Sequence, residues 1–97
     1  TEVALRAFRE VESALASEKW LKQQEFYLRK ELQQAALAER QAERDYAEGI
    51  EGVDIIDLLE SQRRASSARS SLIDLQNQRI QNRINLHLAL GGDFATQ

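Results

Sequence analysis

Apolar residues recur at intervals of three and four along two long stretches of the chain, the spacing of helices that bury one face. No glycine or proline interrupts residues 2–48, and none interrupts residues 55–90. Alternation of apolar and polar residues, which marks a strand, is absent throughout. The pattern therefore predicts an all-α fold with two long helices over these ranges.

Glycines divide the chain at the places where the helical pattern stops. Gly49 and Gly52 stand between the two stretches, and glycine adopts positive φ angles without strain, which predicts a turn over residues 49–54. A connection this short folds the second helix back antiparallel to the first. The chain is thus expected to form a single helical hairpin, residues 1–97.

A second glycine pair, Gly91–Gly92, follows the last periodic residue. Glycine is common directly after the last residue of a helix, where it caps the free carbonyl groups. The pair therefore predicts that the second helix ends at residue 90 and that residues 91–97 form a C-terminal tail.

The apolar seams have coiled-coil spacing but are thin. In the first helix the seam runs through Ala7, Val11, Ala14, Leu21, Leu28, Leu32, Ala35, Ala42 and Tyr46. In the second helix one seam runs through Ile55, Leu58, Ala65 and Leu72, and another through Ile73, Ile80, Ile84 and Leu88. Polar residues interrupt these seams: Glu18, Glu25, Glu39, Gln62, Arg69, Gln76 and Arg79. A free hairpin held by such seams would be marginal, so we expect this coiled-coil hairpin to be one stave of a larger helical wall.

Composition excludes several classes of function. The chain has 97 residues, no cysteine and a net charge of −3 with both signs interspersed, so a disulfide scaffold and a basic nucleic-acid surface are excluded. His87 is the only histidine, which makes a metal site improbable. No nucleophile–base pair and no cofactor loop is present, so we expect neither enzyme activity nor a cofactor. No apolar run approaches the roughly 20 residues of a membrane span, and no signal-peptide pattern opens the chain.

Four stretches in order carry a resemblance to a known family: AFREVESALA at 7–16, YAEG at 46–49, IIDLLESQRRASSAR at 55–69 and NLHLALGG at 85–92. Together they resemble the C-terminal portion of the TolC-like outer membrane factor family, the exit ducts of tripartite efflux pumps and type I secretion systems. The resemblance spans nearly the whole chain.

This resemblance implies a fold and a set of partners. Three protomers of that family form one channel, with a β-barrel in the outer membrane and a helical tunnel across the periplasm of a Gram-negative bacterium. The chain would be a fragment of that tunnel, the second-repeat hairpin, with its turn at the periplasmic tip. The tip closes the channel at rest and meets a periplasmic adaptor (membrane fusion) protein, which links it to an inner-membrane transporter.

Three residues acquire gate or lumen roles from the resemblance. Tyr46 matches a tyrosine that joins a closing hydrogen-bond network in the best-known member, Asp57 matches an aspartate of an acidic ring facing the lumen, and Glu60 matches a second acid one turn later. The chain departs from the family pattern at Glu51, where that member has an arginine, and its turn is about two residues longer than the common spacing.

The turn itself supplies the candidates for contact with the adaptor, which are Gly49, Ile50, Glu51, Gly52, Val53 and Asp54. Apolar side chains at a free end suit a socket for another protein's helices, although they would equally cover the entry to the second helix. The two glycines also serve as plain turn residues, and Asp54 is placed to cap the second helix.

Each acid and the tyrosine also has an ordinary structural interpretation. Asp57 and Glu60 share one helix face and would be solvated surface charges outside a pore, while around a threefold axis they form a ring of six carboxylates. Tyr46 would simply close the seam of the first helix. The alternative function is a soluble coiled-coil interaction module, such as an adaptor or scaffold hairpin. Cut from its neighbours, the hairpin is expected to self-associate as an antiparallel dimer, making a four-helix bundle.

Overall fold

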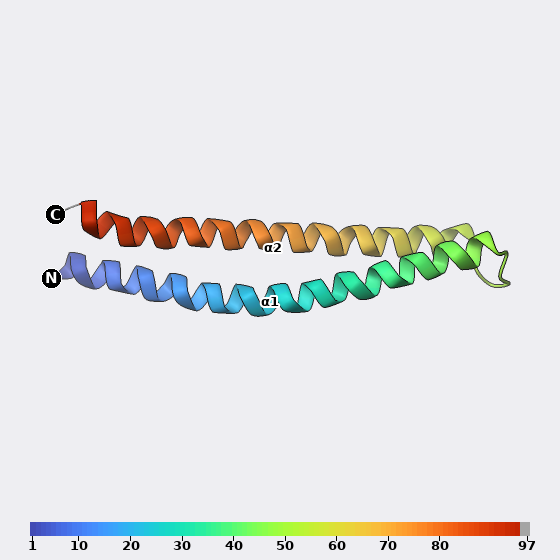
Figure 1. Ribbon diagram of the computed structural model, residues 1–97, viewed down its shortest axis with the longest axis horizontal. Coiled ribbons are helices and arrows are strands. Elements are labelled where there is room, and N and C mark those ends of the chain that lie inside the picture. Colours follow the sequence, from blue (N-terminus) through green and yellow to red (C-terminus); the bar gives the residue numbers. More distant parts are fainter. Residues whose placement is uncertain (96–97) are drawn as a thin grey trace. The chain divides into compact units, whose positions relative to one another are not determined.

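Two long helices make up the part of the chain that the computed structural model describes, residues 1–95. Helix α1 spans Glu2–Ala47 and helix α2 spans Ile55–Ala95, and no strand occurs among the described residues. The helices run antiparallel, as Figure 1 shows, and the turn between them covers residues 48–54. The predicted all-α helical hairpin is confirmed.

The predicted end of the second helix is wrong. Helix α2 continues past Leu90 and through the glycine pair to Ala95, so residues 91–95 are helical rather than a tail. Glycine in a helix costs only about 1 kcal/mol relative to alanine, and no proline follows that would stop the helix. The last two residues of the predicted tail, 96 and 97, lie outside the described part of the chain. The first helix ends one residue before the predicted boundary at residue 48.

A seam with strict seven-residue repeats joins the helices. In α1 the buried and half-buried positions run through Ala7, Val11, Ala14, Glu18, Leu21, Glu25, Leu28, Leu32, Ala35, Glu39 and Ala42. In α2 they run through Leu58, Ser61, Ala65, Ala68, Leu72, Leu75, Arg79, Asn82, Leu86 and Ala89. Because these positions repeat every seven residues, each helix presents the same side to its partner over many turns.

Part of the predicted seams lies elsewhere. Ile73, Ile80, Ile84 and Leu88 are exposed, so this second seam of α2 does not pack against α1. Ile55 and Tyr46, two residues of the predicted seams, are exposed as well. Leu75 and Ala68, which were not in the predicted seams, are buried. Two apolar rows on one helix cannot be ranked from spacing alone, because the row that pairs depends on how the partner helix is rotated.

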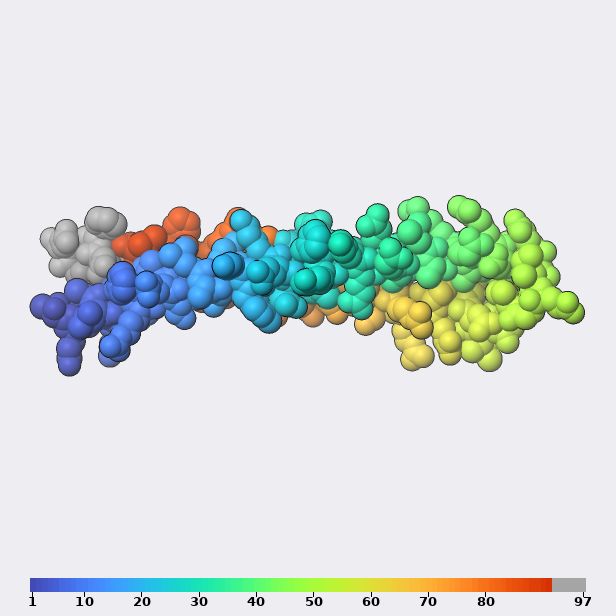
Figure 2. Space-filling view, turned by 90° about the horizontal axis from the view of Figure 1, so that it is seen from below, coloured from blue at the N-terminus to red at the C-terminus, as the bar shows by residue number. Residues whose placement is uncertain are grey.

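The contacts divide the chain into two compact units. The turn unit comprises Phe26–Asp74, and the terminal unit comprises Thr1–Glu25 with Leu75–Gln97. In the turn unit the core is a cluster of Ala35, Ala65 and Ala68, with Leu32 packed against it. Figure 2 shows the green end of α1 lying directly against the yellow start of α2 in this unit. Alanine side chains are short, so they let the two backbones come close together.

Candidate functional site

The turn begins with a helix cap built on Gly49. The Ile50 N–H donates to the Asp45 carbonyl at 2.9 Å, and the Gly49 N–H donates to the Tyr46 carbonyl at 3.2 Å. This pair of bonds, with φ of +71° at Gly49, is the Schellman motif that ends many helices. The backbone conformation at residue 49 therefore favours glycine, and the carbonyl of Tyr46 accepts a hydrogen bond in the same cap.

A β-turn over Ile50–Val53 follows directly. The Val53 N–H donates to the Ile50 carbonyl at 3.2 Å, and Gly52 has a φ of +89°. A positive φ at the third residue, with an ordinary φ at Glu51, defines a type II turn and favours glycine. The predicted positive φ angles at Gly49 and Gly52 are confirmed, and each glycine serves a different turn.

Asp54 and Asp57 then start α2 as a reciprocal cap. Asp54 Oδ1 accepts from the N–H groups of Ile56 and Asp57, both at 3.0 Å, and Asp57 Oδ2 accepts from the Asp54 N–H at 3.1 Å. This is a capping box, with an aspartate in the place usually held by glutamate. Asp54 is thus the helix cap that the sequence suggested. Asp57, a predicted lumen residue, uses one carboxylate oxygen to accept a hydrogen bond in the same cap.

The other predicted site residues are accessible. Tyr46 is 44% exposed in the last turn of α1, Ile50 is 46% exposed, and Val53 is half-buried. Glu51, the second residue of the β-turn, is exposed. Glu60 lines an open groove of the turn unit together with residues of both helices: Glu31, Arg63, Arg64, Ser67, Ala68 and Ser71. The structure thus gathers the candidates around one turn, and their gate and docking roles stay predictions.

A second polar centre lies in the seam of the terminal unit, and it was not predicted from the sequence. The guanidinium of Arg79 on α2 lies between two carboxylates of α1. Its Nη2 donates to Glu18 Oε1 at 2.8 Å, and its Nη1 donates to Glu25 Oε2. The side chains of all three are less than one fifth exposed. One cation therefore ties together two acids that are two helical turns apart.

Neutral and charged neighbours complete what we call the Arg79 cluster, which comprises Glu18, Glu25, Gln76, Arg79, Asn82 and Arg83. Asn82 Nδ2 donates to the Ala14 carbonyl at 2.9 Å and lies 3.5 Å from Glu18 Oε2. Gln76 Nε2 donates to Glu25 Oε1 at 3.4 Å, and Arg83 Nε lies 3.6 Å from Glu18 Oε1.

The hydrogen bond from Arg79 lowers the pKa of the Glu18 carboxyl below its ordinary value, with Asn82 adding to the effect against partial desolvation. The same bond raises the pKa of the Arg79 guanidinium. Both shifts favour the charged forms. The ion pair thus stays charged at neutral pH.

A signal for this cluster was present in the sequence. The residues that interrupt the seam of α1 are acids, and those that interrupt the seam of α2 include two arginines. Antiparallel packing brings Arg79 against Glu18 and Glu25, and it places Arg69, which lies beside the seam, 3.5 Å from Glu39 between Nη2 and Oε2. Acids in the predicted seam of one helix and arginines in that of the other therefore predict interhelix ion pairs. The spacing of apolar residues alone does not give this prediction.

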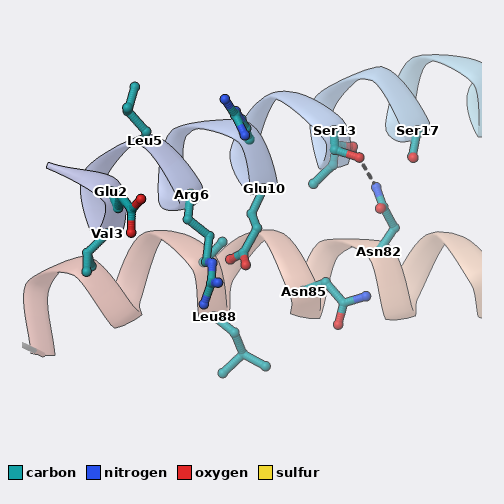
Figure 3. A pocket seen from close by; sticks show the side chains of 13 residues that line it. Glu2, Val3, Leu5, Arg6, Glu10, Ser13, Ser17, Asn82, Asn85 and Leu88 are labelled. Atoms are coloured by element: carbon teal, nitrogen blue, oxygen red, sulfur yellow. Dashed lines mark hydrogen bonds between the residues drawn. The ribbon is translucent and has the colours of Figure 1, made fainter.

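Beyond the cluster the terminal unit has an open groove of about 1250 Å³ between α1 and α2. Figure 3 shows Arg6 and Glu10 reaching from α1 toward α2, and Asn82 reaching back. The lining is mixed: Glu2, Val3, Leu5, Arg6, Arg9, Glu10, Ser13, Ala14, Ser17, Asn82, Asn85, Leu88 and Ala89. Over the described residues no cluster of metal-ligating side chains occurs, and neither helix is long and apolar enough to cross a membrane.

Comparison with known families decides what kind of protein contains this hairpin. The model of the family described as outer membrane efflux protein matches residues 1–92. The chain belongs to this family. No curated protein and no solved structure matches the chain. The outer membrane efflux proteins are transport proteins of the Gram-negative outer membrane, so the predicted family and the broad function are both confirmed.

Proposed function

We propose that the chain is one hairpin of the periplasmic helical tunnel of a homotrimeric outer-membrane efflux channel. Its turn, residues 48–54, forms part of the gated tip that docks the periplasmic adaptor, which in turn joins the inner-membrane transporter. Membership of the outer membrane efflux protein family supports the channel. The division of the hairpin into a polar and an apolar side supports the place in its wall.

Polar residues border the groove of each unit. In the terminal unit Glu10, Ser17 and Asn85 border the open groove, and in the turn unit Glu31 and Ser71 border the other. On α1, residues 10, 17 and 31 are separated by multiples of seven, as are 71 and 85 on α2, so each set keeps one position in the repeat. A side of this kind suits the water-filled lumen of a tunnel.

Rows of exposed apolar residues lie at other positions of the repeat. Phe8 and Leu15 form such a row on α1, and Leu59 and Ile73 form one on α2. All four are more than half exposed, and neither groove is lined by them. Neighbouring hairpins that cover these rows would remove apolar surface from water, which is the main driving force for association.

Asp57 keeps the repeat position of the polar side, fourteen residues before Ser71, and Glu60 borders the groove itself. In a trimer these two acids would supply six carboxylates around the lumen near the tip. Such a ring attracts cations and repels anions. Tyr46, one turn before the cap at Gly49, would close the gate from the other helix.

Planar bilayer recordings of the complete channel test this proposal. Asp57→Asn removes the charge but keeps an oxygen that accepts from the Asp54 N–H, so the cap survives. We expect this variant to lose cation selectivity and Tyr46→Phe to raise the resting conductance. Glu43→Gln is the matched control, because residue 43 lies in the row of Phe8 and Leu15, away from the polar side. No channel at all, or one unaffected by Asp57→Asn and Tyr46→Phe, would leave the hairpin as an interaction module and Asp57 as an ordinary surface charge.

A further inference from the structure

Side-chain hydrogen bonds of the Arg79 cluster join α1 to α2 in the described part of the terminal unit. Three residues of α2 donate these bonds, and the acceptors on α1 are the carboxylates of Glu18 and Glu25 and the Ala14 carbonyl. Each bond needs a defined distance and direction, so the helices cannot rotate or separate there without breaking the network.

Apolar packing in the same unit is concentrated next to the cluster. Among the described residues its buried apolar side chains are Ala14, Leu21 and Leu75. Toward the chain ends the seam positions Ala7, Val11, Leu86 and Ala89 are only half-buried, and the open groove takes up the space between the helices. Between the cluster and the chain ends little apolar burial therefore holds the helices together, and the polar network carries a large share of their association there.

We propose that the Arg79 cluster is a polar clasp that controls a local opening of the hairpin. When water replaces its hydrogen bonds, α1 and α2 separate in the terminal unit, while the alanine-packed turn unit stays paired. The two units would then be two cooperative units of unfolding within one continuous pair of helices. This inference concerns the hairpin's own stability and does not depend on the channel proposal.

The chemistry of the clasp makes such opening reversible. Four charged groups face one another there: Glu18 and Glu25 on α1, and Arg79 and Arg83 on α2. Water can solvate each of these charged groups when the helices part. Apolar side chains in the same positions could not form hydrogen bonds with water when the helices separate.

Hydrogen exchange of the full chain, followed peptide by peptide with mass spectrometry, tests the clasp. Arg79→Leu takes the shared guanidinium away from two largely buried carboxylates, so peptides from residues 2–25 and 75–92 should exchange at least roughly tenfold faster, with peptides from residues 26–74 unchanged. Arg69→Leu is the matched control, because it removes the arginine of a more exposed interhelix pair in the turn unit. It should change exchange less than about twofold in either unit.

The triple variant Glu18→Leu, Glu25→Leu, Arg79→Leu tests the proposal in the opposite direction, because it should stabilise the terminal unit. Leucine at these three seam positions lengthens the apolar seam, so the terminal unit should exchange more slowly than in the unchanged protein. Equal acceleration of both units by Arg79→Leu would show one cooperative hairpin and overturn the proposal. A triple variant whose terminal unit exchanges as fast as before would overturn it too.

Discussion

The turn unit and the terminal unit use the same seven-residue repeat to join the same two helices, yet they join them by different physical means. In the turn unit alanines meet, with Ala65 fully buried, and dispersion and apolar burial act between closely spaced backbones. In the terminal unit the guanidinium of Arg79, fourteen residues after Ala65 and so at the same position of the repeat, meets two carboxylates. Repeat spacing therefore determines where helices touch, while side-chain volume and charge determine how tightly and how reversibly they do so.

Enlarging the alanine core should have the largest effect on stability. Ala65→Leu adds three carbons at a position with no exposed surface, so the helices must move apart, and we expect a loss of about 2 kcal/mol in the free energy of unfolding. Urea denaturation followed by circular dichroism measures this loss.

Ala14→Leu is the comparison for that variant. Ala14 is buried in the terminal unit but borders the open groove, which can receive the extra carbons, so its cost should stay below about 1 kcal/mol. Equal losses for the two variants would mean that the units are packed alike, and the contrast between them would fail.

The glycines provide an intermediate effect with opposite signs. Gly49→Ala should lower the free energy of unfolding by about 1 kcal/mol, because its positive φ strains any residue with a Cβ. Gly91→Ala should raise it by roughly 0.5 kcal/mol, because residue 91 is helical. An added Cβ has nothing within 4 Å at either position, so backbone conformation alone separates the two. Thermal unfolding of both variants gives the signs, and a destabilising Gly91→Ala would argue against a helix through residue 91.

Acid should produce the smallest of these effects and act on the terminal unit. The bond from Arg79 places the folded-state pKa of Glu18 below its ordinary value of 4.5. Its contribution to stability is therefore complete above the unfolded pKa and is lost as the pH falls through the lower folded pKa. We expect the melting temperature to fall less steeply between pH 5 and 3 in Glu18→Gln than in the unchanged protein. The same change at the exposed Glu12 is the control, and identical slopes for all three proteins would contradict the prediction.

Much of the hairpin could be predicted from local sequence. An uninterrupted helical pattern, two glycines with positive φ and a capping aspartate are properties of short segments, so the helices, the turn and the role of Asp54 followed without a structure. The helix end at residue 90 could not be predicted, because a glycine pair allows a cap but does not impose one. The candidate residues at the turn came from the family resemblance, and the structure adds that Asp57 belongs to the cap of α2.

Pairing across the hairpin was the part that sequence left open. Spacing offered two apolar rows on α2, and only the antiparallel packing shows that Leu72 and Leu75 face α1 while Ile73 and Ile80 stay exposed. Likewise Glu18 and Arg79 are 61 residues apart in the chain, and each by itself is an ordinary polar interruption. Secondary structure follows from the preferences of neighbouring residues, whereas the Arg79 cluster depends on the rotation and alignment of one helix against the other, which only the tertiary structure decides.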